Sequence, residues 1–406
     1  MPCYGNHFVE APYLDRMAAE GACFEYCRTV FPACTPARAS MWTGLYPHAH
    51  GIVRNVYGDA DALGAGRIAD ASIFRLLGDA GYECAYFGKW HLGDNNPGAF
   101  SVWETFNSLG GHWVDGRQGF QGGTYIPDRD TDRLISWMRG RQTRDRPFAA
   151  VISYYPPHDP FSSPLDCMDR YRRLGVPFPG YYGSVTALDR CVGRVLAALE
   201  ESDLLDDTIV FYFSDHGETF HDRDGVTGKF VCTDDALRVP FIVMYRGRIP
   251  SGRRSSALIG LLDLMPTMLD YAGAVPQNSL HGQSLRLLLE GADDTPWRQS
   301  FYIENETHHA LRRADQPVRP RRHERAVCTD RFKLIVAADD DAPRLYDMVD
   351  DPEERLDIVG GKLASAGGQI GEQVERLLRA LLEHATAVDD DFGIEITRRH
   401  LVAMSG

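Results

Sequence analysis

The clearest strand pattern in the chain is Thr208-Ile209-Val210-Phe211-Tyr212-Phe213, which runs directly into Ser214-Asp215-His216-Gly217. Aromatic and β-branched residues favour strands, and a continuous apolar run of this length is typical of a strand buried on both faces. Strands of this kind form open α/β sheets, in which ligands bind where loops leave the carboxyl ends of the strands. We therefore expect Asp215 and His216 to lie at a functional edge of a sheet.

Strand and helix patterns alternate over most of the first 295 residues. Apolar residues on one helical face predict amphipathic helices, and short apolar runs that end in loop residues predict strands. The predicted helices are 71–80, 184–201 and 258–272, and the predicted strands are 82–87, 148–154, 208–213 and 238–245. This alternation predicts the α/β fold class, with one large, mixed but mostly parallel sheet sandwiched by helices.

The pattern changes after about residue 295. Residues 306–325 are polar and basic, and we interpret them as a solvated loop rather than as a binding patch. Short strands and a final amphipathic helix are predicted at 325–329, 333–337 and 373–384. We therefore predict a main domain at 1–295 and a smaller C-terminal α+β subdomain at 296–406, made of a short antiparallel sheet plus a helix.

The bulk composition argues against some classes of function. Lys and Arg number 43 against 57 Asp and Glu, and the net charge of −14 argues against a nucleic-acid partner. The nine cysteines include no Cys-x-x-Cys pair, which argues against a disulfide framework or a zinc site and favours reduced, buried thiols. No apolar run is long enough to predict a membrane span.

Three predicted strands end in residues suited to anion or metal chemistry. In chain order these are Lys89 and His91, then His158, then Asp215 and His216. One such residue alone is usually a solvated loop residue, but their joint occurrence at successive strand ends indicates a shared site. Cys34 precedes a predicted helix at 37–44, and the free N–H groups at a helix start favour negative charge.

Several separated motifs carry a family resemblance. The stretch Cys34-Thr35-Pro36-Ala37-Arg38 resembles the Cys-x-Pro-x-Arg signature of the type I sulfatases. Gly88-Lys89-Trp90-His91-Leu92-Gly93 resembles the Gly-Lys-x-His-x-Gly element of that family, and Ser214-Asp215-His216-Gly217-Glu218 is similar to its late metal-binding element. Lys229, followed by 236–240, resembles the part that bears the second active-site lysine. The chain is identified as a member of the sulfatase branch of the alkaline phosphatase superfamily, with its catalytic domain in 1–295.

The resemblance implies how Cys34 acts. In this family a maturation enzyme oxidises the cysteine to formylglycine, and one oxygen of the hydrated aldehyde attacks the sulfur of a sulfate ester. The second hydroxyl then eliminates sulfate and restores the aldehyde, with His91 as the implied base. Arg38 and Lys89 are implied to hold the hydrated aldehyde and its metal.

The other implied roles concern the sulfate and the metal ion. Lys229 and His158 are implied to bind the sulfate oxygens and to assist the leaving group. Asp215 and His216 are implied to bind a divalent cation, which is Ca²⁺ by family habit. Many relatives have Asn at the position of His216, and calcium prefers oxygen donors, so Mg²⁺ and Mn²⁺ stay open.

One family feature is missing from the sequence. Family members begin with a hydrophobic strand that ends in two acidic metal ligands, whereas this chain begins at Met1-Pro2 and shows neither. Loss of a central strand would leave its neighbours unpaired. Either the chain starts late relative to the working protein, or it is a variant with altered or lost metal binding. Neither Glu10 nor Asp15 is assigned to metal.

The same N-terminal stretch bears on location. Met1-Pro2-Cys3-Tyr4-Gly5 lacks the basic and apolar stretches of a signal peptide, so we predict a cytoplasmic location from this sequence. A periplasmic or secreted location follows if the chain starts late.

The predicted function is hydrolysis of a sulfate ester of a small molecule or a carbohydrate. The alternatives are a phosphonate monoester or phosphodiester hydrolase, which uses the same nucleophile and metal, and an inactive protein that binds an anion. We expect residues 97–127 and Tyr154-Tyr155-Pro156-Pro157-His158 to shape the leaving-group pocket, with aromatic surfaces that suit sugar rings and aryl groups equally.

Overall fold

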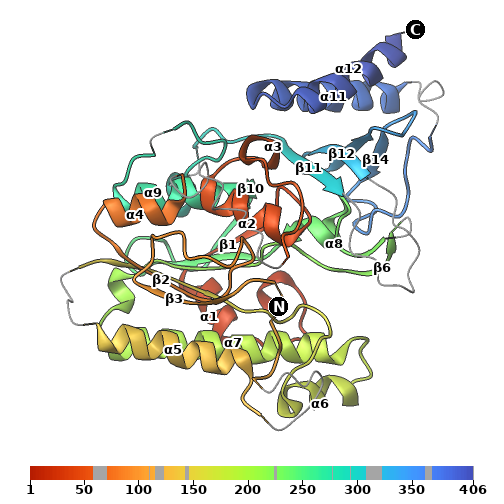
Figure 1. Ribbon diagram of the computed structural model, residues 1–406. Coiled ribbons are helices and arrows are strands. Elements are labelled where there is room, and N and C mark those ends of the chain that lie inside the picture. The colour runs from red at the N-terminus through yellow and green to blue at the C-terminus, as the bar shows by residue number, and fades with distance from the viewer. Residues whose placement is uncertain are drawn as a thin grey trace.

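The computed structural model describes most of the chain, namely residues 1–57, 71–108, 110–114, 123–141, 146–223, 226–276, 278–292, 294–307, 322–361 and 368–405. Over these ranges the chain forms two β-sheets between layers of helices, with an antiparallel sheet and two further helices at the C-terminal end (Figure 1). The predicted α/β fold class is confirmed.

The main body contains two sheets with different strand directions. One has the order β10 (Arg253–Gly260), β1 (Ala22–Arg28), β9 (Phe241–Met244), β5 (Val210–Phe213). In it β1 is parallel to β10, but β9 is antiparallel to both β1 and β5, and the short β8 (Arg238–Val239) also pairs with β1. The other sheet is wholly parallel, with the order β3 (Val102–Phe106), β2 (Glu83–Lys89), β4 (Phe148–Ser153).

The central strands are apolar because both of their faces are covered. Along β9, Phe241 and Val243 join the core on one side of the sheet, and Ile242 and Met244 join the core on the other. This is the period of two that a strand imposes on its side chains. The continuous apolar runs that predicted buried strands are therefore explained by two cores that share one sheet.

Helices form the two outer layers (Figure 1). In the view of Figure 1, α5 (Ile126–Gly140) and α7 (Pro179–Glu201) lie below the sheets. The helices α2 (Cys34–Thr43), α4 (Ile73–Asp79) and α9 (Leu264–Ala272) lie above them. The remaining helices of the main body are α1 (Pro12–Glu20), α3 (Pro47–His50), α6 (Leu165–Arg173), α8 (Asp234–Leu237) and α10 (Arg286–Leu289), with 3₁₀ turns at Pro2–Tyr4, Leu205–Asp207 and Leu261–Asp263. Within the described residues no helix is both long and apolar enough to cross a bilayer.

The C-terminal part is an antiparallel sheet that packs against a helix, as predicted. Its strands follow in chain order as β11 (Phe301–Thr307), β12 (Arg322–Cys328), β13 (Phe332–Ala337) and β14 (Arg344–Asp347). The long α11 (Gln369–Ala387) buries the stripe Val374, Leu377, Leu378, Leu381 and Ala385 in the core of this sheet. A second helix, α12 (Asp391–Ser405), was not predicted. The boundary at 295/296 stays a prediction.

Three sequence predictions need correction in detail. The predicted helix 258–272 begins as the end of β10, and only 264–272 is α-helical, because a short apolar run does not distinguish a buried strand from a helix. The predicted strand 238–245 is interrupted at Pro240, which has no N–H for the sheet. Within the predicted loop 306–325, both ends belong to β11 and β12, and its central part, 308–321, lies outside the described residues.

The two sheets of the main body do not meet. Among the described strands, β4 pairs only with β2 and β5 pairs only with β9, so each has one edge without a partner strand. A cavity of about 900 Å³ lies between these edges. Its lining includes Val151, Ile152, Phe211, Leu196 and Met268, with Ser153, Arg38 and Asp215 also among the lining residues. The predicted large sheet is thus interrupted between β4 and β5.

Candidate active site

Cys34 lies in the first turn of α2 and is 1% exposed. The helix can begin here because Pro36 falls in the first turn, where its missing N–H leaves no hydrogen bond unmade. The side-chain oxygen of Asn55 accepts a hydrogen bond from the N–H of Thr35 at 2.9 Å, which satisfies another free donor of this turn. Gly44 ends the helix with a left-handed φ of 65°.

Three basic side chains surround the sulfur of Cys34. The Nζ atoms of Lys229 and Lys89 lie 3.3 Å and 3.4 Å from Sγ, and Nε2 of His216 lies 3.0 Å from it. Lys89 ends β2, and Lys229 follows the hairpin of β6 (Thr219–Arg223) and β7 (Val226–Gly228). Burial alone would raise the pKa of the Cys34 thiol, but the charges of Lys229, Lys89 and His216 hold it well below its ordinary value. The site therefore stabilises negative charge at this position.

Arg38 forms hydrogen bonds to groups at the ends of both sheets of the main body. Its Nε donates to Oδ2 of Asp215 at 2.8 Å, and its Nη1 donates to the carbonyl of Lys89 at 2.9 Å and to Oγ of Ser153 at 3.0 Å. Burial would raise the pKa of Asp215, but the neighbouring Arg38 guanidinium keeps the pKa well below its usual range. Asp215 is therefore a carboxylate although it lies in the protein interior.

The two remaining histidines differ in their contacts. His158 lies beside Lys229, with Nε2 3.1 Å from Nζ. His91 is 3% exposed, has a left-handed φ of 57°, and neither of its ring nitrogens has a hydrogen-bond partner. Burial lowers the pKa of His91, so its imidazole is neutral and able to accept a proton. A strained, buried base without a partner is typical of a functional residue.

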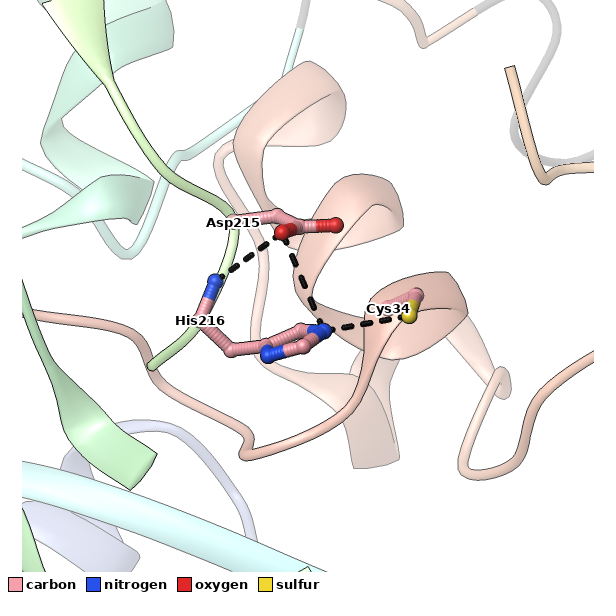
Figure 2. Close-up of side chains that lie close together, drawn as sticks. All are labelled: Cys34, Asp215 and His216. Atoms are coloured by element: carbon pink, nitrogen blue, oxygen red, sulfur yellow. Dashed lines mark hydrogen bonds and ion pairs between the residues drawn. The ribbon is translucent and has the colours of Figure 1, made fainter. Parts of the chain in front are cut away.

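Three donor atoms stand together in the centre of the site (Figure 2). They belong to Cys34, Asp215 and His216, and they all lie within 4.8 Å of one another. The group joins the start of α2 to the loop after β5. These residues are the ones that could hold a metal ion.

The structure brings together the residues that the sequence predicted. They are Cys34, Arg38, Lys89, His91, His158, Asp215, His216 and Lys229. Their chemical roles stay predictions. Tyr155 was predicted only as a pocket residue, and its ring stacks on His158 with centroids 4.7 Å apart, while Nζ of Lys89 lies 5.3 Å from the ring centroid. Asn55 and Ser153 were missed, because a lone amide or hydroxyl carries no sequence signal of its contacts.

A family comparison decides what this arrangement is. The family model described as sulfatase matches residues 1–274, and the model of the N-sulphoglucosamine sulphohydrolase C-terminal region matches 224–382. The chain belongs to the sulfatase family. The predicted membership in the sulfatase branch of the alkaline phosphatase superfamily is thereby confirmed.

Curated relatives of this sulfatase family member span most of its length. An N-acetylglucosamine-6-O-sulfatase of Bacteroides thetaiotaomicron is 27% identical, with 89% of this chain and 80% of the relative covered. An arylsulfatase of Clostridium perfringens is 24% identical, with 96% and 92% covered. A multifunctional alkaline phosphatase superfamily protein of Trinickia caryophylli is 25% identical, with 93% and 90% covered.

Solved structures share the fold. One, in complex with its substrate D-glucosamine-2-N,6-O-disulfate, has a TM-score of 0.80 and 23% identity, with 97% of this chain and 96% of that chain covered. The phosphonate monoester hydrolase of Agrobacterium radiobacter has a TM-score of 0.71 and 20% identity, with 95% and 93% covered. The common fold thus carries both sulfate and phosphonate chemistry in its known members.

Proposed function

We propose that this sulfatase family member hydrolyses a sulfate ester through a formylglycine made from Cys34. The observation that carries the proposal is the placement of the Cys34 side chain at a helix start, between two lysine ammonium groups at 3.3 Å and 3.4 Å. A sulfuryl group bound there would have its oxygens neutralised by fixed cations, which is the largest single contribution to catalysis of this kind.

The chemistry begins with oxidation of the Cys34 side chain to an aldehyde by a separate maturation enzyme, and water then adds to give a gem-diol. One hydroxyl releases its proton to solvent, its oxygen attacks sulfur, and the bond from sulfur to the ester oxygen breaks. The leaving alcohol takes a proton from the pair formed by Lys229 and His158, whose nitrogens lie 3.1 Å apart.

Release of sulfate needs a base. His91 is buried, neutral and unpaired, so it is suited to take the proton of the second hydroxyl. The bond from carbon to the sulfate oxygen then breaks, sulfate leaves, and the aldehyde is restored. A divalent cation held by Asp215 and His216 would act as a Lewis acid on the sulfate oxygens.

The substrate class that we propose is a sulfated carbohydrate. Curated relatives are named for sulfated sugars, and one solved structure of the fold contains a sulfated glucosamine. The ring of Tyr155 adds an aromatic face beside His158. Hydrolysis of a panel of sulfated mono- and disaccharides, compared with an aryl sulfate, tests this proposal. A clear preference for the aryl sulfate would overturn the carbohydrate assignment.

Peptide mass spectrometry tests the nucleophile. In cells with maturation activity, the peptide that carries Cys34 is expected to become lighter, because CH₂SH is replaced by CHO. An unmodified peptide combined with no turnover would favour the inactive anion-binding alternative.

A phosphonate monoester hydrolase is the second candidate, since the same cluster of cations can bind any tetrahedral oxyanion. Paired rates on an aryl sulfate and an aryl phosphonate that share one leaving group distinguish the two functions.

A further inference from the structure

A neighbouring backbone carbonyl fixes the orientation of the His216 ring. Its Nδ1 lies 2.7 Å from the carbonyl oxygen of Gly217. A carbonyl oxygen only accepts hydrogen bonds, so Nδ1 carries a proton and Nε2 is the ring nitrogen left to face the site. Nε2 lies 3.0 Å from Sγ of Cys34 and 3.8 Å from Oδ1 of Asp215, where the neutral ring would present its lone pair to a metal ion. A backbone carbonyl that holds the second ring nitrogen is the usual support of a metal-binding histidine.

The donor set does not fit calcium. Ca²⁺ takes about six to eight oxygen ligands and disfavours nitrogen and sulfur. The described residues offer one carboxylate in this cluster, together with an imidazole and a thiol. Oδ2 of that carboxylate accepts a hydrogen bond from Nε of Arg38 at 2.8 Å, and Oδ1 accepts one from the N–H of His216 at 3.1 Å, so this carboxylate has few lone pairs left for calcium. Magnesium, which prefers an octahedral shell of oxygens, fits no better.

The same donors fit a borderline transition metal. Sulfur, imidazole nitrogen and a carboxylate oxygen are the ligand types of protein-bound zinc, and three protein ligands leave a fourth position open. We infer that Cys34, Asp215 and His216 form a three-ligand site for a zinc-like transition-metal ion. The inference goes beyond the proposed function, because it needs only the thiol form of the chain and no turnover.

The charges around the cluster indicate which ligand would bind at the fourth position of the metal ion. The thiolate and the carboxylate cancel the charge of a divalent ion, and binding releases the thiol proton to solvent. The ammonium groups of Lys89 and Lys229 remain beside the sulfur at 3.4 Å and 3.3 Å. The fourth position therefore takes a small oxyanion, and inorganic sulfate is the probe of choice.

Cobalt titration tests the inference directly. The full chain is produced without maturation activity, so that Cys34 stays a thiol, and is stripped of metal with a chelator. Anaerobic Co²⁺ is expected to bind one ion per chain with a thiolate-to-cobalt charge-transfer band and the visible spectrum of a tetrahedral site. One equivalent of Zn²⁺ should remove the band, whereas excess Ca²⁺ should leave it unchanged. Absence of saturable binding, or displacement of Co²⁺ by Ca²⁺, overturns the inference.

Two substitutions assign the ligands. Cys34→Ser should abolish the charge-transfer band. His216→Asn replaces an imidazole nitrogen with an amide oxygen and should weaken Co²⁺ binding by about 100-fold or more. Loss of a residue that only supports a ligand already weakens metal binding by up to about 100-fold, and loss of a ligand itself should weaken it at least as much. Cys84→Ala is the matched control, because Cys84 is a buried thiol at the other end of β2, about 17 Å along the strand from Lys89. A band that persists in Cys34→Ser, or unchanged affinity in His216→Asn, contradicts the site.

One further measurement needs no variant. The ¹⁵N resonance of His216 Nε2 should shift on addition of Zn²⁺ to the unsubstituted chain, while Nδ1 keeps its proton. A histidine spectrum that does not respond to Zn²⁺ would reject the ligand assignment even if a variant failed to fold. Because conversion of Cys34 is measured separately by mass spectrometry, failure of the proposed function and failure of this inference give different results.

Discussion

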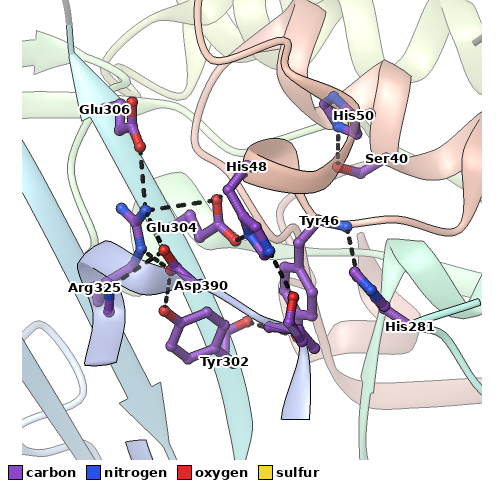
Figure 3. Close-up of polar contacts among 12 residues, drawn as sticks. Ser40, Tyr46, His48, His50, His281, Tyr302, Glu304, Glu306, Arg325 and Asp390 are labelled. Atoms are coloured by element: carbon purple, nitrogen blue, oxygen red, sulfur yellow. Dashed lines mark hydrogen bonds and ion pairs between the residues drawn. The ribbon is translucent and has the colours of Figure 1, made fainter. Parts of the chain in front are cut away.

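Among the residues that the structure describes, two clusters have the composition of a metal site, and their surroundings differ. The first is the active-site group Cys34, Asp215 and His216, and the second is His48, Glu304 and Asp390 at the contact between α3 and the C-terminal sheet (Figures 2 and 3). In both, the donor atoms lie within 4.8 Å of one another. The difference lies in the charges that surround those atoms.

In the second cluster, each candidate ligand residue already forms hydrogen bonds or ion pairs with other protein groups. Nδ1 of His48 lies 2.6 Å from Oε1 of Glu304, and its Nε2 lies 2.8 Å from the carbonyl of Val388, so both nitrogens act as donors and the ring is an imidazolium. Arg325 is 1% exposed and binds Asp390, with Glu304 4.0 Å away. A guanidinium occupies the place that a cation would need.

In the active-site cluster the charges are inverted. The ammonium groups of Lys89 and Lys229 lie beside the thiol, Arg38 binds Asp215, and both nitrogens of the nearby His91 lack hydrogen-bond partners. The comparison teaches that donor composition alone does not define a functional site. In the active-site cluster, cations are held around a position that stabilises negative charge, whereas the second cluster is a network of ion pairs among protein groups that stabilises the fold.

The largest expected effect breaks the active-site cluster. Cys34→Ala should lower turnover of an aryl sulfate by at least ~10³-fold, because it removes the nucleophile. The measurement is steady-state hydrolysis, with the circular dichroism spectrum confirming the fold. Cys84→Ala should retain the rate of the unsubstituted enzyme, and a normal rate in Cys34→Ala would refute the assignment.

The next effect breaks the structural cluster. Arg325→Ala leaves the buried carboxylate of Asp390 without its guanidinium partner and removes a nearby cation from Glu304 and Glu306, so it should destabilise the fold by about 3–5 kcal/mol, measured by urea unfolding. The matched control is Arg331→Ala. The Arg331 side chain lies in the turn between β12 and β13, is 48% exposed and pairs with Asp347 and Asp350, so its loss should destabilise the fold by no more than about 1 kcal/mol. Equal effects of the two changes would show that the cluster has no structural role.

A subtler change tests the fixed charge beside the nucleophile. Lys229→Ala should lower kcat by about 10²–10³-fold, because it removes one cation from the developing negative charge. Lys229→Arg keeps the charge and should recover part of the rate. If Lys229→Arg and Lys229→Ala were equally slow, the effect would come from geometry and not from charge.

The smallest effect concerns pH. Burial lowers the pKa of His48, but its hydrogen bond to Glu304 outweighs this and raises the pKa above its ordinary value. A raised pKa contributes stability that is fully present below the unfolded-state pKa of about 6.5 and is lost as pH rises through the folded-state pKa. We expect His48→Gln to remove about 0.5–1 kcal/mol of stability at pH 6 and less at pH 9, since water screens this partly exposed pair. Parallel unfolding curves at both pH values would contradict this role.

The sequence predicted the active site better than it predicted the fold around it. The reactive residues lie within short, contiguous motifs at strand ends, so local spacing carried the information for Lys89, His91, Asp215 and His216. The second cluster, which contains His48, Glu304 and Asp390, could not be predicted from the sequence. Glu304, Arg325 and Asp390 are single residues on separate segments that meet only after folding. Tyr155 was predicted near the site, but its stack on His158 depends on ring orientation, which a sequence does not encode.

The errors in secondary structure have a similar cause. Residues 258–260 are apolar enough for either a helix or a strand, and pairing with β1 decided between them. The second C-terminal helix, α12, was missed although Asp391 begins it, because its apolar residues follow the contact with α11 rather than a simple stripe.

The cavity between β4 and β5 has a mechanical consequence. Lys89 and His158 follow strands of one sheet, Asp215 and His216 follow a strand of the other, and the guanidinium of Arg38 spans the two. A cavity of about 900 Å³ lies between these sheets, and the loss of internal void volume on unfolding makes a protein sensitive to pressure. Hydrostatic pressure should therefore destabilise this fold, in which the hydrogen bonds of Arg38 connect the two halves of the active site across the cavity.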